Sequence, residues 1–303
     1  FIFIVIILFM NNMGETNDDI IVMLSFYLAA AYRFVPSINK IFVSYQQIKF
    51  GKPTIPKIME YYNLKKNNQF IENQPTDNSI EFKKKINLKD ISFGYQKDKN
   101  IIQNLNFEIP NNKIIGITGE SGSGKSTIVN LLTGLIKSSE GKITVDDKEL
   151  DDPLSLRQYQ NLFSITSQDT YLIDGTIKEN IMFGSSDKIS DERLKSSLKF
   201  VRLEKTLNNL PNGIETYIGS NIKQLSSGQK QRISIARSIY SDRKILIFDE
   251  ATNALDKESE KYIFENLKNL KTKKTIIIIS HDPDNLKICD ILLRVENRNF
   301  ASD

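Results

Sequence analysis

Nine consecutive residues near the middle of the chain have the types and spacing needed to hold a phosphate group. They fit the pattern G-x-x-x-x-G-K-[ST] and are Gly119-Glu120-Ser121-Gly122-Ser123-Gly124-Lys125-Ser126-Thr127. The glycines let backbone N–H groups curl around phosphate oxygens. We expect Lys125 to reach the β- and γ-phosphates and the Ser126 hydroxyl to be a ligand of Mg²⁺. The run therefore predicts a nucleoside-triphosphate site, and a Gly-Ser turn with a surface lysine is the alternative.

A pair of carboxylates further along the chain could act on that phosphate. Asp249 and Glu250 follow four apolar residues, 245–248, which is typical of a central parallel strand covered on both faces. Ligands bind at the carboxyl ends of such strands. We expect Asp249 to hold Mg²⁺ through water, and Glu250 to orient and deprotonate an attacking water. Taken alone, the segment could also be a strand followed by a solvated acidic turn.

The elements that would position these groups are visible on either side of the glycine-rich run. Apolar residues 114, 115 and 117 predict a buried strand before it, and apolar positions 128, 129, 131, 132, 135 and 136 predict a helix after it. A strand, a tight turn and a helix are the context that the motif requires. The helix N-terminus adds a partial positive charge at the phosphates.

These residues resemble the nucleotide-binding domain of ATP-binding cassette (ABC) proteins. The pentapeptide Leu225-Ser226-Ser227-Gly228-Gln229 is similar to that family's signature, usually written LSGGQ. The resemblance covers about 220 residues, from roughly Ile86 to the C-terminus. It implies an α/β P-loop NTPase cassette with a RecA-like core, an antiparallel β-subdomain and a helical subdomain that carries the signature. It also implies that ATP and Mg²⁺ are the ligands.

Several further positions match that family's motifs in the same order along the chain. Gln168 resembles the Q-loop glutamine that contacts Mg²⁺ and the water, and Asp256 resembles the D-loop residue at the dimer interface. His281, the only histidine, resembles the switch histidine near the γ-phosphate. With Glu250 and Lys125, these would be the catalytic groups.

Two of these positions have ordinary structural alternatives. Tyr95 resembles the aromatic residue that stacks on adenine, although aromatic residues in a β-rich segment usually belong to the core. A lone histidine is more often a surface or core residue, but His281 directly follows a predicted buried strand, 275–280. Cys289 is the only cysteine, permits no internal disulfide, and is expected to pack in the core.

The signature has a physical role that one chain cannot complete. Ser226 and Gly228 are expected to open a helix over residues 229–240, and a helix N-terminus with a serine hydroxyl is an anion site. In the family's head-to-tail dimer this site meets the γ-phosphate held by the partner subunit. The resemblance therefore implies a second cassette subunit, with a homodimer expected. Ser227 replaces the usual glycine but keeps the backbone N–H.

Two segments before the signature resemble exporter cassettes in particular. Residues 177–184 are similar to a stretch common in exporters, as are residues 210–213 and 216–219. Exporters usually have a glutamate next, where this chain has Ser220. Residues 191–210 carry apolar positions that predict a helical segment of the signature subdomain.

The N-terminal quarter has the composition of membrane helices. Residues 1–10 contain no polar side chain, and ten residues rise only about 15 Å, so we interpret them as the truncated end of a transmembrane helix. The apolar core of a signal peptide is the alternative, but the run is preceded by neither an initiator methionine nor a basic segment. Residues 11–19 carry three acids, a mostly apolar run continues to about Val43, and residues 40–66 hold six lysines and one acid. The positive-inside rule places the lysine-rich end, and so the cassette, in the cytoplasm.

These observations predict the organisation of the chain. Residues 1–62 would be the end of an exporter transmembrane domain, 63–84 a linker and 85–303 the cassette. The longer protein would be multi-pass in the cell membrane, in contact with lipid. Residues 31–41 resemble exporters that flip lipid-linked oligosaccharides, and Arg33 lies about 21 Å along a helix from Asp19. Arg33 could contact such a substrate's pyrophosphate in a cavity, or snorkel to the interface.

Other functional classes fit the sequence less well. A net charge of +4 does not indicate nucleic acid binding. Soluble ABC proteins usually carry two cassettes or a coiled-coil insertion, and an importer ATPase would be a separate soluble chain. A regulatory cassette would normally have lost its base or switch residue. The sequence therefore predicts an ATPase cassette of an ABC exporter that moves a lipid-linked or other amphipathic substrate.

Overall fold

The structure is a computed structural model, and it describes most of the chain. The described residues are 4, 7, 9, 12, 16–66, 80–96, 100–120, 122–150, 152–185, 190–219, 225–296 and 299–302. Two residues discussed above, Ser121 and Ser220, lie outside them, as do most of residues 1–15 and all of residues 67–79. The chain divides into two units, Phe1–Gln74 and Pro75–Asp303, and each is described by itself.

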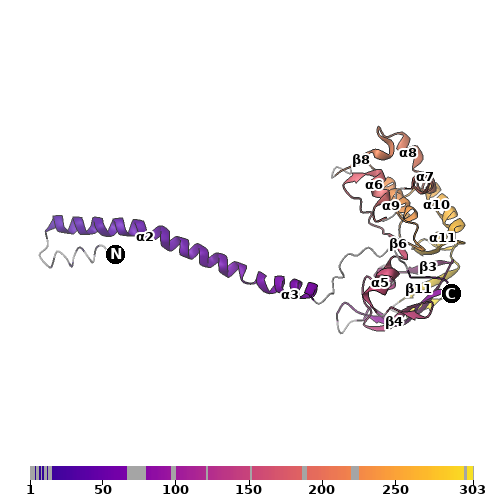
Figure 1. Cartoon of the computed structure of the whole chain (residues 1–303), viewed down its shortest axis with the longest axis horizontal. Coiled ribbons are helices and arrows are strands. Elements are labelled where there is room, and N and C mark those ends of the chain that lie inside the picture. The colour runs from indigo at the N-terminus through magenta and orange to yellow at the C-terminus, as the bar shows by residue number, and fades with distance from the viewer. Residues whose placement is uncertain are drawn as a thin grey trace. The chain divides into compact units, whose positions relative to one another are not determined.

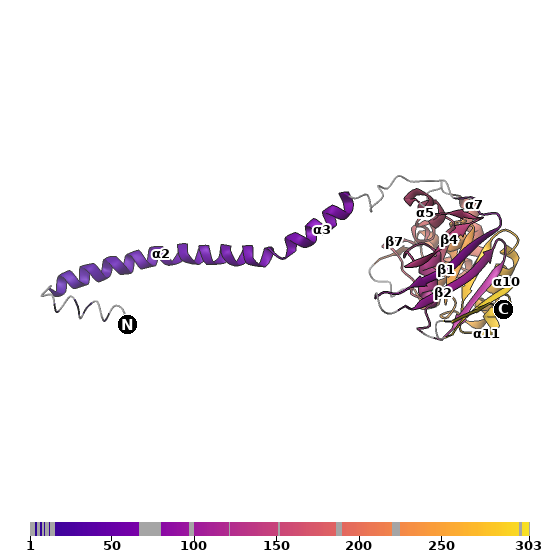
Figure 2. The same ribbon diagram turned by 90° about the horizontal axis from the view of Figure 1, so that it is seen from below.

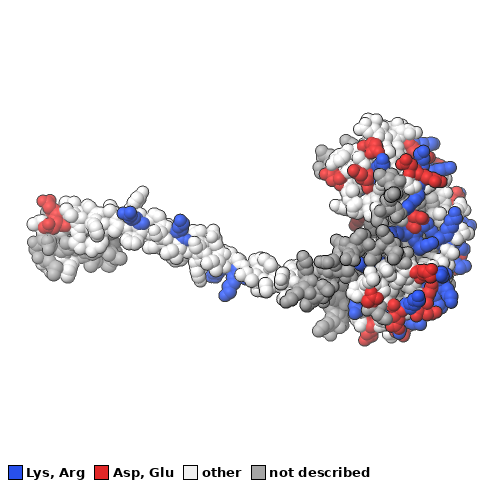
Figure 3. All heavy atoms as spheres, viewed as in Figure 1, with Lys and Arg blue, Asp and Glu red and all other residues white. Residues whose placement is uncertain are grey.

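The first unit is dominated by two helices, α2 (Asn17–Gly51) and α3 (Thr54–Lys66). Thr16 caps α2, and Asp18 and Asp19 in the first turn suit the positive end of the helix dipole. The helical stretch Asp18–Asn63 is long and apolar enough to cross a membrane, and it is the one such stretch among the described residues. Few charged side chains lie along it, whereas the second unit is covered with them (Figure 3).

The second unit contains two main sheets. The smaller is antiparallel, with the order β2-β1-β4-β5. Figure 2 shows β1, β2 and β4 side by side. Its strands are β1 (Lys85–Phe93), β2 (Ile102–Pro110), β4 (Glu140–Val145) and β5 (Lys148–Glu149). Buried apolar residues alternate with exposed polar residues along β2, so this sheet buries one face and leaves the other to solvent.

The larger sheet has the order β12-β11-β3-β10-β9-β6, and all its strands are parallel except β12. The strands are β3 (Ile114–Gly119), β6 (Phe163–Thr166), β9 (Ile245–Asp249), β10 (Thr275–Ile279), β11 (Ile291–Glu296) and β12 (Asn299–Ser302). The central strand β10 is buried throughout, because both faces of the sheet are covered. Parallel pairing brings the carboxyl ends of β3, β6, β9 and β10 to one edge.

Two hydrophobic cores pack on the opposite faces of this sheet. Along β9, Ile245 and Ile247 belong to the core shared with the antiparallel sheet, whereas Leu246 and Phe248 belong to the other. Strand alternation explains this division, because successive side chains point to opposite faces. Helices α4 (Lys125–Leu132) and α5 (Pro153–Gln160) contribute to the first core, and α10 (Lys257–Leu270) contributes to the second.

A helical region extends the second core and forms one end of the second unit (Figure 1). Its elements are β7 (Gly175–Thr176), α6 (Ile177–Met182), α7 (Asp191–Phe200), α8 (Glu204–Asn208), η1 (Gly213–Glu215), β8 (Tyr217–Ile218) and α9 (Ser227–Tyr240). The segment predicted as helical over 191–210 forms two helices. Arg202 lies between them with φ of 54°, a left-handed conformation that a continuous α-helix excludes. Helix α11 (Pro283–Leu286) follows β10.

Candidate functional site

The glycine-rich run connects the end of β3 to the start of α4, as its flanking sequence predicts. Gly122 and Gly124 have φ of 79° and 107°, values that side chains disfavour. A Cβ atom on Gly119 would lie 2.4 Å from the carbonyl oxygen of Val295, so no side chain fits there. The turn therefore requires glycine, and it exposes backbone N–H groups at the N-terminus of α4.

Lys125 lies folded over this turn. Its Nζ donates hydrogen bonds to the carbonyl oxygens of Gly119 at 2.9 Å and Glu120 at 2.8 Å. Burial lowers the pKa of Lys125, while Glu250 and Asp249 oppose that shift. The hydroxyl of Ser123 is buried and has no hydrogen-bond partner. A buried donor without a partner costs free energy, so phosphate oxygens would complete this site.

Asp249 ends β9 beside these groups. Burial raises its pKa, the neighbouring Glu250 raises it further, and Lys125 lowers it. Among the described residues no cluster of three or more His, Cys, Asp or Glu could enclose a metal ion. Mg²⁺ commonly takes one or two carboxylates and fills its shell with water and substrate phosphates. Asp249 and the exposed Ser126 at the start of α4 fit that mode of binding.

Glu250 is held in one orientation from both sides. Its Oε1 lies 2.8 Å from Nε2 of His281, and its Oε2 accepts a hydrogen bond of 3.0 Å from Nδ2 of Asn253. Its φ is 49°, an uncommon left-handed conformation for a residue with a side chain. The backbone N–H of Glu250 donates to the carbonyl oxygen of Ile279, which links the loop to the end of β10. The structure thus brings Glu250 and His281 together.

Gln168 and Tyr95 lie on the surface. Gln168 is exposed two residues beyond the end of β6, the strand that pairs with β9. Tyr95 is 63 % exposed, and its ring packs edge-to-face on Phe93, with 5.0 Å between ring centroids. The carbonyl of Phe93 accepts from the N–H of Ile101, and Ile101 also lies next to Gly124. Tyr95 therefore belongs to the strand end next to the phosphate turn.

The signature forms the first turn of α9 rather than only preceding it. The helix begins at Ser227, two residues earlier than predicted, because Ser226 and Gln229 form a capping box. The Ser226 hydroxyl accepts from the N–H of Gln229 at 3.2 Å, and Oε1 of Gln229 accepts from the N–H of Ser226 at 2.9 Å. Leu225 is buried, whereas Ser226 and Ser227 are exposed.

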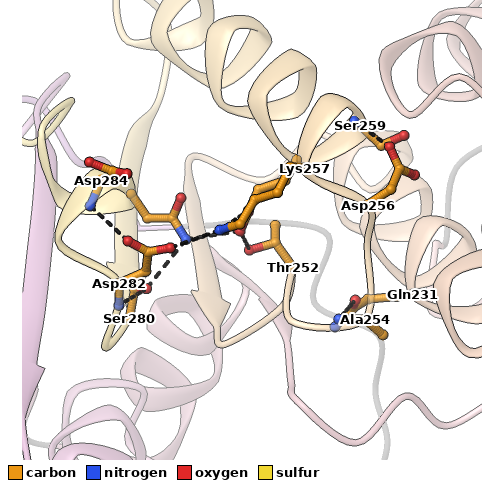
Figure 4. Close-up of polar contacts among 11 residues, drawn as sticks. Gln231, Thr252, Ala254, Asp256, Lys257, Ser259, Ser280, Asp282 and Asp284 are labelled. Atoms are coloured by element: carbon orange, nitrogen blue, oxygen red, sulfur yellow. Dashed lines mark hydrogen bonds and ion pairs between the residues drawn. The ribbon is translucent and has the colours of Figure 1, made fainter.

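The loop after Glu250 packs against this turn of α9. A Cβ on Gly228 would lie 2.9 Å from the carbonyl oxygen of Ala254, so glycine is needed for the close approach. Asp256 caps α10 by accepting from the N–H of Ser259 at 2.9 Å (Figure 4). Arg232 on α9 donates to both of these side chains, at 3.0 Å to Asp256 and 2.6 Å to Ser259.

Two residues of α9 that hold this loop were missed in the sequence. Gln231 accepts from the N–H of Ala254 at 2.9 Å (Figure 4). It also donates to the carbonyl of Glu250 at 3.5 Å. Arg232 follows it directly. Both come just after the signature, and their proximity to it in sequence is the signal that could have identified them. Arg33 belongs to the other unit, where it is exposed on α2.

A family model described as ABC transporter matches residues 102–253, about half of the chain. The chain belongs to the ABC transporter family. Its fold agrees with the predicted ATP-binding cassette, and the matched residues lie in the second unit. The matched residues include the glycine-rich turn, the signature and Glu250.

Individual relatives agree with this assignment. The chain is 34 % identical to a putative ABC transporter ATP-binding protein of Mycoplasma genitalium, over 84 % of this chain and 42 % of that protein. It is 36 % identical to an ATP-dependent lipid A-core flippase of Vibrio vulnificus, over 71 % of this chain and 37 % of that protein. The solved structure of a bacterial Atm1-family ABC exporter with ATP bound superposes with a TM-score of 0.72 at 28 % identity, covering 92 % of this chain and 48 % of that one. The chain thus spans less than half the length of these relatives.

Proposed function

We propose that this chain is part of an ABC exporter and that its cassette hydrolyses ATP to drive export or flipping of a lipid-linked or other amphipathic molecule. The observation that carries the proposal is the Glu250 carboxylate, oriented by His281 and Asn253 at the same sheet edge as Lys125. The names of the relatives, a lipid A-core flippase and an exporter, support export. They give no support to a soluble ABC protein or an importer subunit.

The chemistry would follow from how the residues are held. Lys125 would exchange its two backbone carbonyls for β- and γ-phosphate oxygens, and the hydroxyl of Ser123 would donate to another. Glu250 would accept a proton from the attacking water, with Nε2 of His281 and Nδ2 of Asn253 fixing the carboxylate. Tyr95 would stack on the adenine ring.

Mg²⁺ would be held by the Ser126 hydroxyl, Asp249 and Gln168, and it would neutralise developing charge on the phosphates. The partly buried Asp249 supports this assignment, because burial and the neighbouring Glu250 raise its pKa more than Lys125 lowers it. The cation would compensate the charge of this carboxylate.

A second copy of the chain would complete the ATP site. The exposed Ser226 and Ser227, with the N–H groups of Gly228 and Gln229, lie at the N-terminus of a 14-residue helix, where an anion is stabilised. We propose that they meet the γ-phosphate held by the second copy in a homodimer, with Leu225 anchoring the turn and Asp256 at the dimer interface. The family membership supports this arrangement.

The first unit would place the cassette at a membrane. We propose that residues 1–62 belong to the transmembrane domain, 63–84 to a linker and 85–303 to the cassette, on the cytoplasmic side of the cell membrane. The apolar, exposed helix α2 supports contact with lipid. A lipid-linked oligosaccharide is the proposed substrate, with Arg33 as a candidate contact.

Replacing the proposed base tests the function. In Glu250→Gln we expect MgATP hydrolysis to fall by at least about a hundredfold, because an amide cannot accept the proton and general base catalysis contributes 10²–10⁴-fold. ATP binding should remain, and ATP-dependent dimerisation should strengthen because the bound nucleotide is no longer consumed. Phosphate release and size-exclusion chromatography with ATP measure the two effects.

The matched control is Glu265→Gln, since Glu265 is an exposed carboxylate on α10 away from the loop that carries Glu250. It should hydrolyse ATP like the wild type. Equal hydrolysis by Glu250→Gln and the wild type would show that Glu250 is not the base.

A further inference from the structure

A buried carboxylate outside the ATP site joins the segments that hold its two catalytic side chains. Glu260 lies in the first turn of α10 and is 8 % exposed. Its Oε1 accepts hydrogen bonds from Oγ1 of Thr252 at 2.8 Å and from Nδ2 of Asn285 at 2.9 Å. Its Oε2 accepts from Nζ of Lys257 at 3.3 Å. Burial of a carboxylate is expensive unless hydrogen bonds compensate it, so these partners must be held in place.

Each buried partner is close in sequence to a catalytic group. Thr252 lies two residues after Glu250, in the loop that begins with the left-handed backbone of that residue. Asn285, on α11, also donates to Oγ of Ser280 at 3.4 Å, and Ser280 directly precedes His281. The same hydroxyl accepts from the N–H of Asp282 at 3.0 Å (Figure 4).

A second connection runs along the exposed side of Glu260. Nζ of Lys257 lies 3.0 Å from Oδ2 of Asp282 and thus bridges Glu260 to the residue after His281. Lys257 follows the capping residue Asp256 (Figure 4), and Arg232 forms an ion pair with Asp256. The segments on both sides of His281 and the loop after Glu250 therefore meet at one carboxylate.

We propose that Glu260 is a positioning residue for ATP hydrolysis, whose buried carboxylate fixes the separation of Glu250 from His281 and ties both to the start of α10. The inference rests on the proposed function, because it assumes that Glu250 and His281 act together. A left-handed residue such as Glu250 keeps its conformation only when its surroundings enforce it. Thr252 and Asn285 are the contacts through which Glu260 enforces it.

The test compares Glu260→Ala and Glu260→Gln with the control Glu265→Ala, an exposed position on the same helix. In Glu260→Ala we expect kcat for MgATP to fall about tenfold or more, since a misplacement near 1 Å can cost about 10²-fold, while KM changes less than about twofold. Glu260→Gln keeps an oxygen that can accept from Thr252 and Asn285, so it should retain most of kcat. A loss of kcat in Glu260→Gln as large as in Glu260→Ala, or an unchanged kcat in Glu260→Ala, would overturn the proposal.

A second measurement needs no hydrolysis. His281 is the only histidine, so the imidazole ¹⁵N resonances of labelled protein report on it alone. They should shift in Glu260→Ala and in Glu250→Gln, and stay unchanged in Glu265→Ala. Unshifted resonances in Glu260→Ala would refute the positioning role even if Glu250 proved not to be the base. Should Glu260→Ala fail to fold, the near-isosteric Thr252→Val removes one hydrogen bond to Glu260. It should change both kcat and the His281 resonances, by less than Glu260→Ala would. If neither quantity changed, the result would count against the proposal.

Discussion

Different side-chain environments surround the two adjacent carboxylates at the end of β9, and they fit the different roles proposed for them. Asp249 is partly buried with a raised pKa, which suits a residue that shares a cation with phosphates. Glu250 instead faces hydrogen-bond donors from His281 and Asn253. The left-handed backbone of Glu250 costs on the order of 1 kcal/mol, and a glycine would avoid that cost. The conformation therefore persists because the surrounding contacts enforce it.

Asp249 should reduce the stability of the nucleotide-free protein. Its folded-state pKa is raised above the unfolded value, so the ionised carboxylate destabilises the fold at neutral pH, and the penalty is relieved as pH falls through the folded-state pKa. We expect Asp249→Asn to raise Tm at pH 7 by about 2–4 °C, toward the lower end because solvent screens a partly buried charge. Calorimetry without nucleotide or Mg²⁺ measures the change.

The gain from Asp249→Asn should shrink as pH is lowered, because the protonated aspartic acid no longer carries the penalty. The exposed Asp169 supplies a control, since Asp169→Asn should leave Tm within about 1 °C. A Tm below that of the wild type at pH 7 for Asp249→Asn would contradict the argument.

The sequence predicted where the residues proposed to bind and hydrolyse ATP lie in the fold. The glycine-rich turn, Asp249, Glu250 and His281 could be predicted because each follows an apolar strand, and parallel strands bring such residues to one edge. The supporting residues Asn253 and Glu260 were missed. They are ordinary polar residues in a loop and on a helix. Asn253 bonds to Glu250 within one loop, and Glu260 reaches Thr252 and Asn285 only through the tertiary fold, which no local pattern specifies.

At the scale of elements, the buried strands β3, β9 and β10 followed from hydrophobic patterning, whereas element boundaries and the order of strands in the sheet did not. Helix α9 starts earlier than predicted because the Gln229 side chain closes a capping box, a three-dimensional contact. The helical stretch after residue 190 breaks at Arg202, which no glycine or proline marks. Such boundaries depend on capping and tertiary packing, so sequence periodicity places them within a few residues only.

The packing of the loop against α9 predicts that Gly228→Ala destabilises the protein, the opposite of the usual effect of alanine in a helix. Alanine usually stabilises a helix by about 0.5–1 kcal/mol relative to glycine. In Gly228→Ala the added Cβ would lie 2.9 Å from the Ala254 carbonyl, so we expect a loss of about 1–3 kcal/mol and reduced hydrolysis as the loop is displaced. Chemical denaturation and phosphate release measure these changes.

The neighbouring position provides the comparison for Gly228→Ala. Ser227 is exposed, and Ser227→Gly restores the family's usual residue. Apart from the cost of placing a glycine in a helix, the free energy of unfolding should stay within about 0.5 kcal/mol of the wild-type value. Stabilisation by Gly228→Ala would show that the loop yields to the extra methyl group without cost.

At the scale of the whole molecule, the chain combines a charge-poor helical unit with a charged α/β cassette and spans less than half the length of its relatives. The cassette's fold could be predicted because its motifs are specific. The substrate could not, because cargo recognition depends on residues around a transmembrane cavity, and the described part of the first unit consists mainly of α2 and α3.

Arg33 allows a test of the proposed substrate in the full-length protein. A cavity arginine binds a pyrophosphate through its planar fork, which lysine lacks. We therefore expect Arg33→Ala and Arg33→Lys to lower flipping of a fluorescent lipid-linked oligosaccharide in proteoliposomes by about tenfold or more and about threefold respectively, with basal ATP hydrolysis unchanged. Flipping at the wild-type rate in Arg33→Ala would make Arg33 an interfacial anchor instead.

The folded position of Lys125 has a consequence for how nucleotide enters. Its ammonium group donates hydrogen bonds to the carbonyls of Gly119 and Glu120, which hold the side chain at the turn. Arrival of ATP would then be an exchange of acceptors rather than a folding event, so binding would require little loop reorganisation. The two carbonyls would compete with ATP for the ammonium group of Lys125, so a strongly charged group such as a polyphosphate would be needed to replace them.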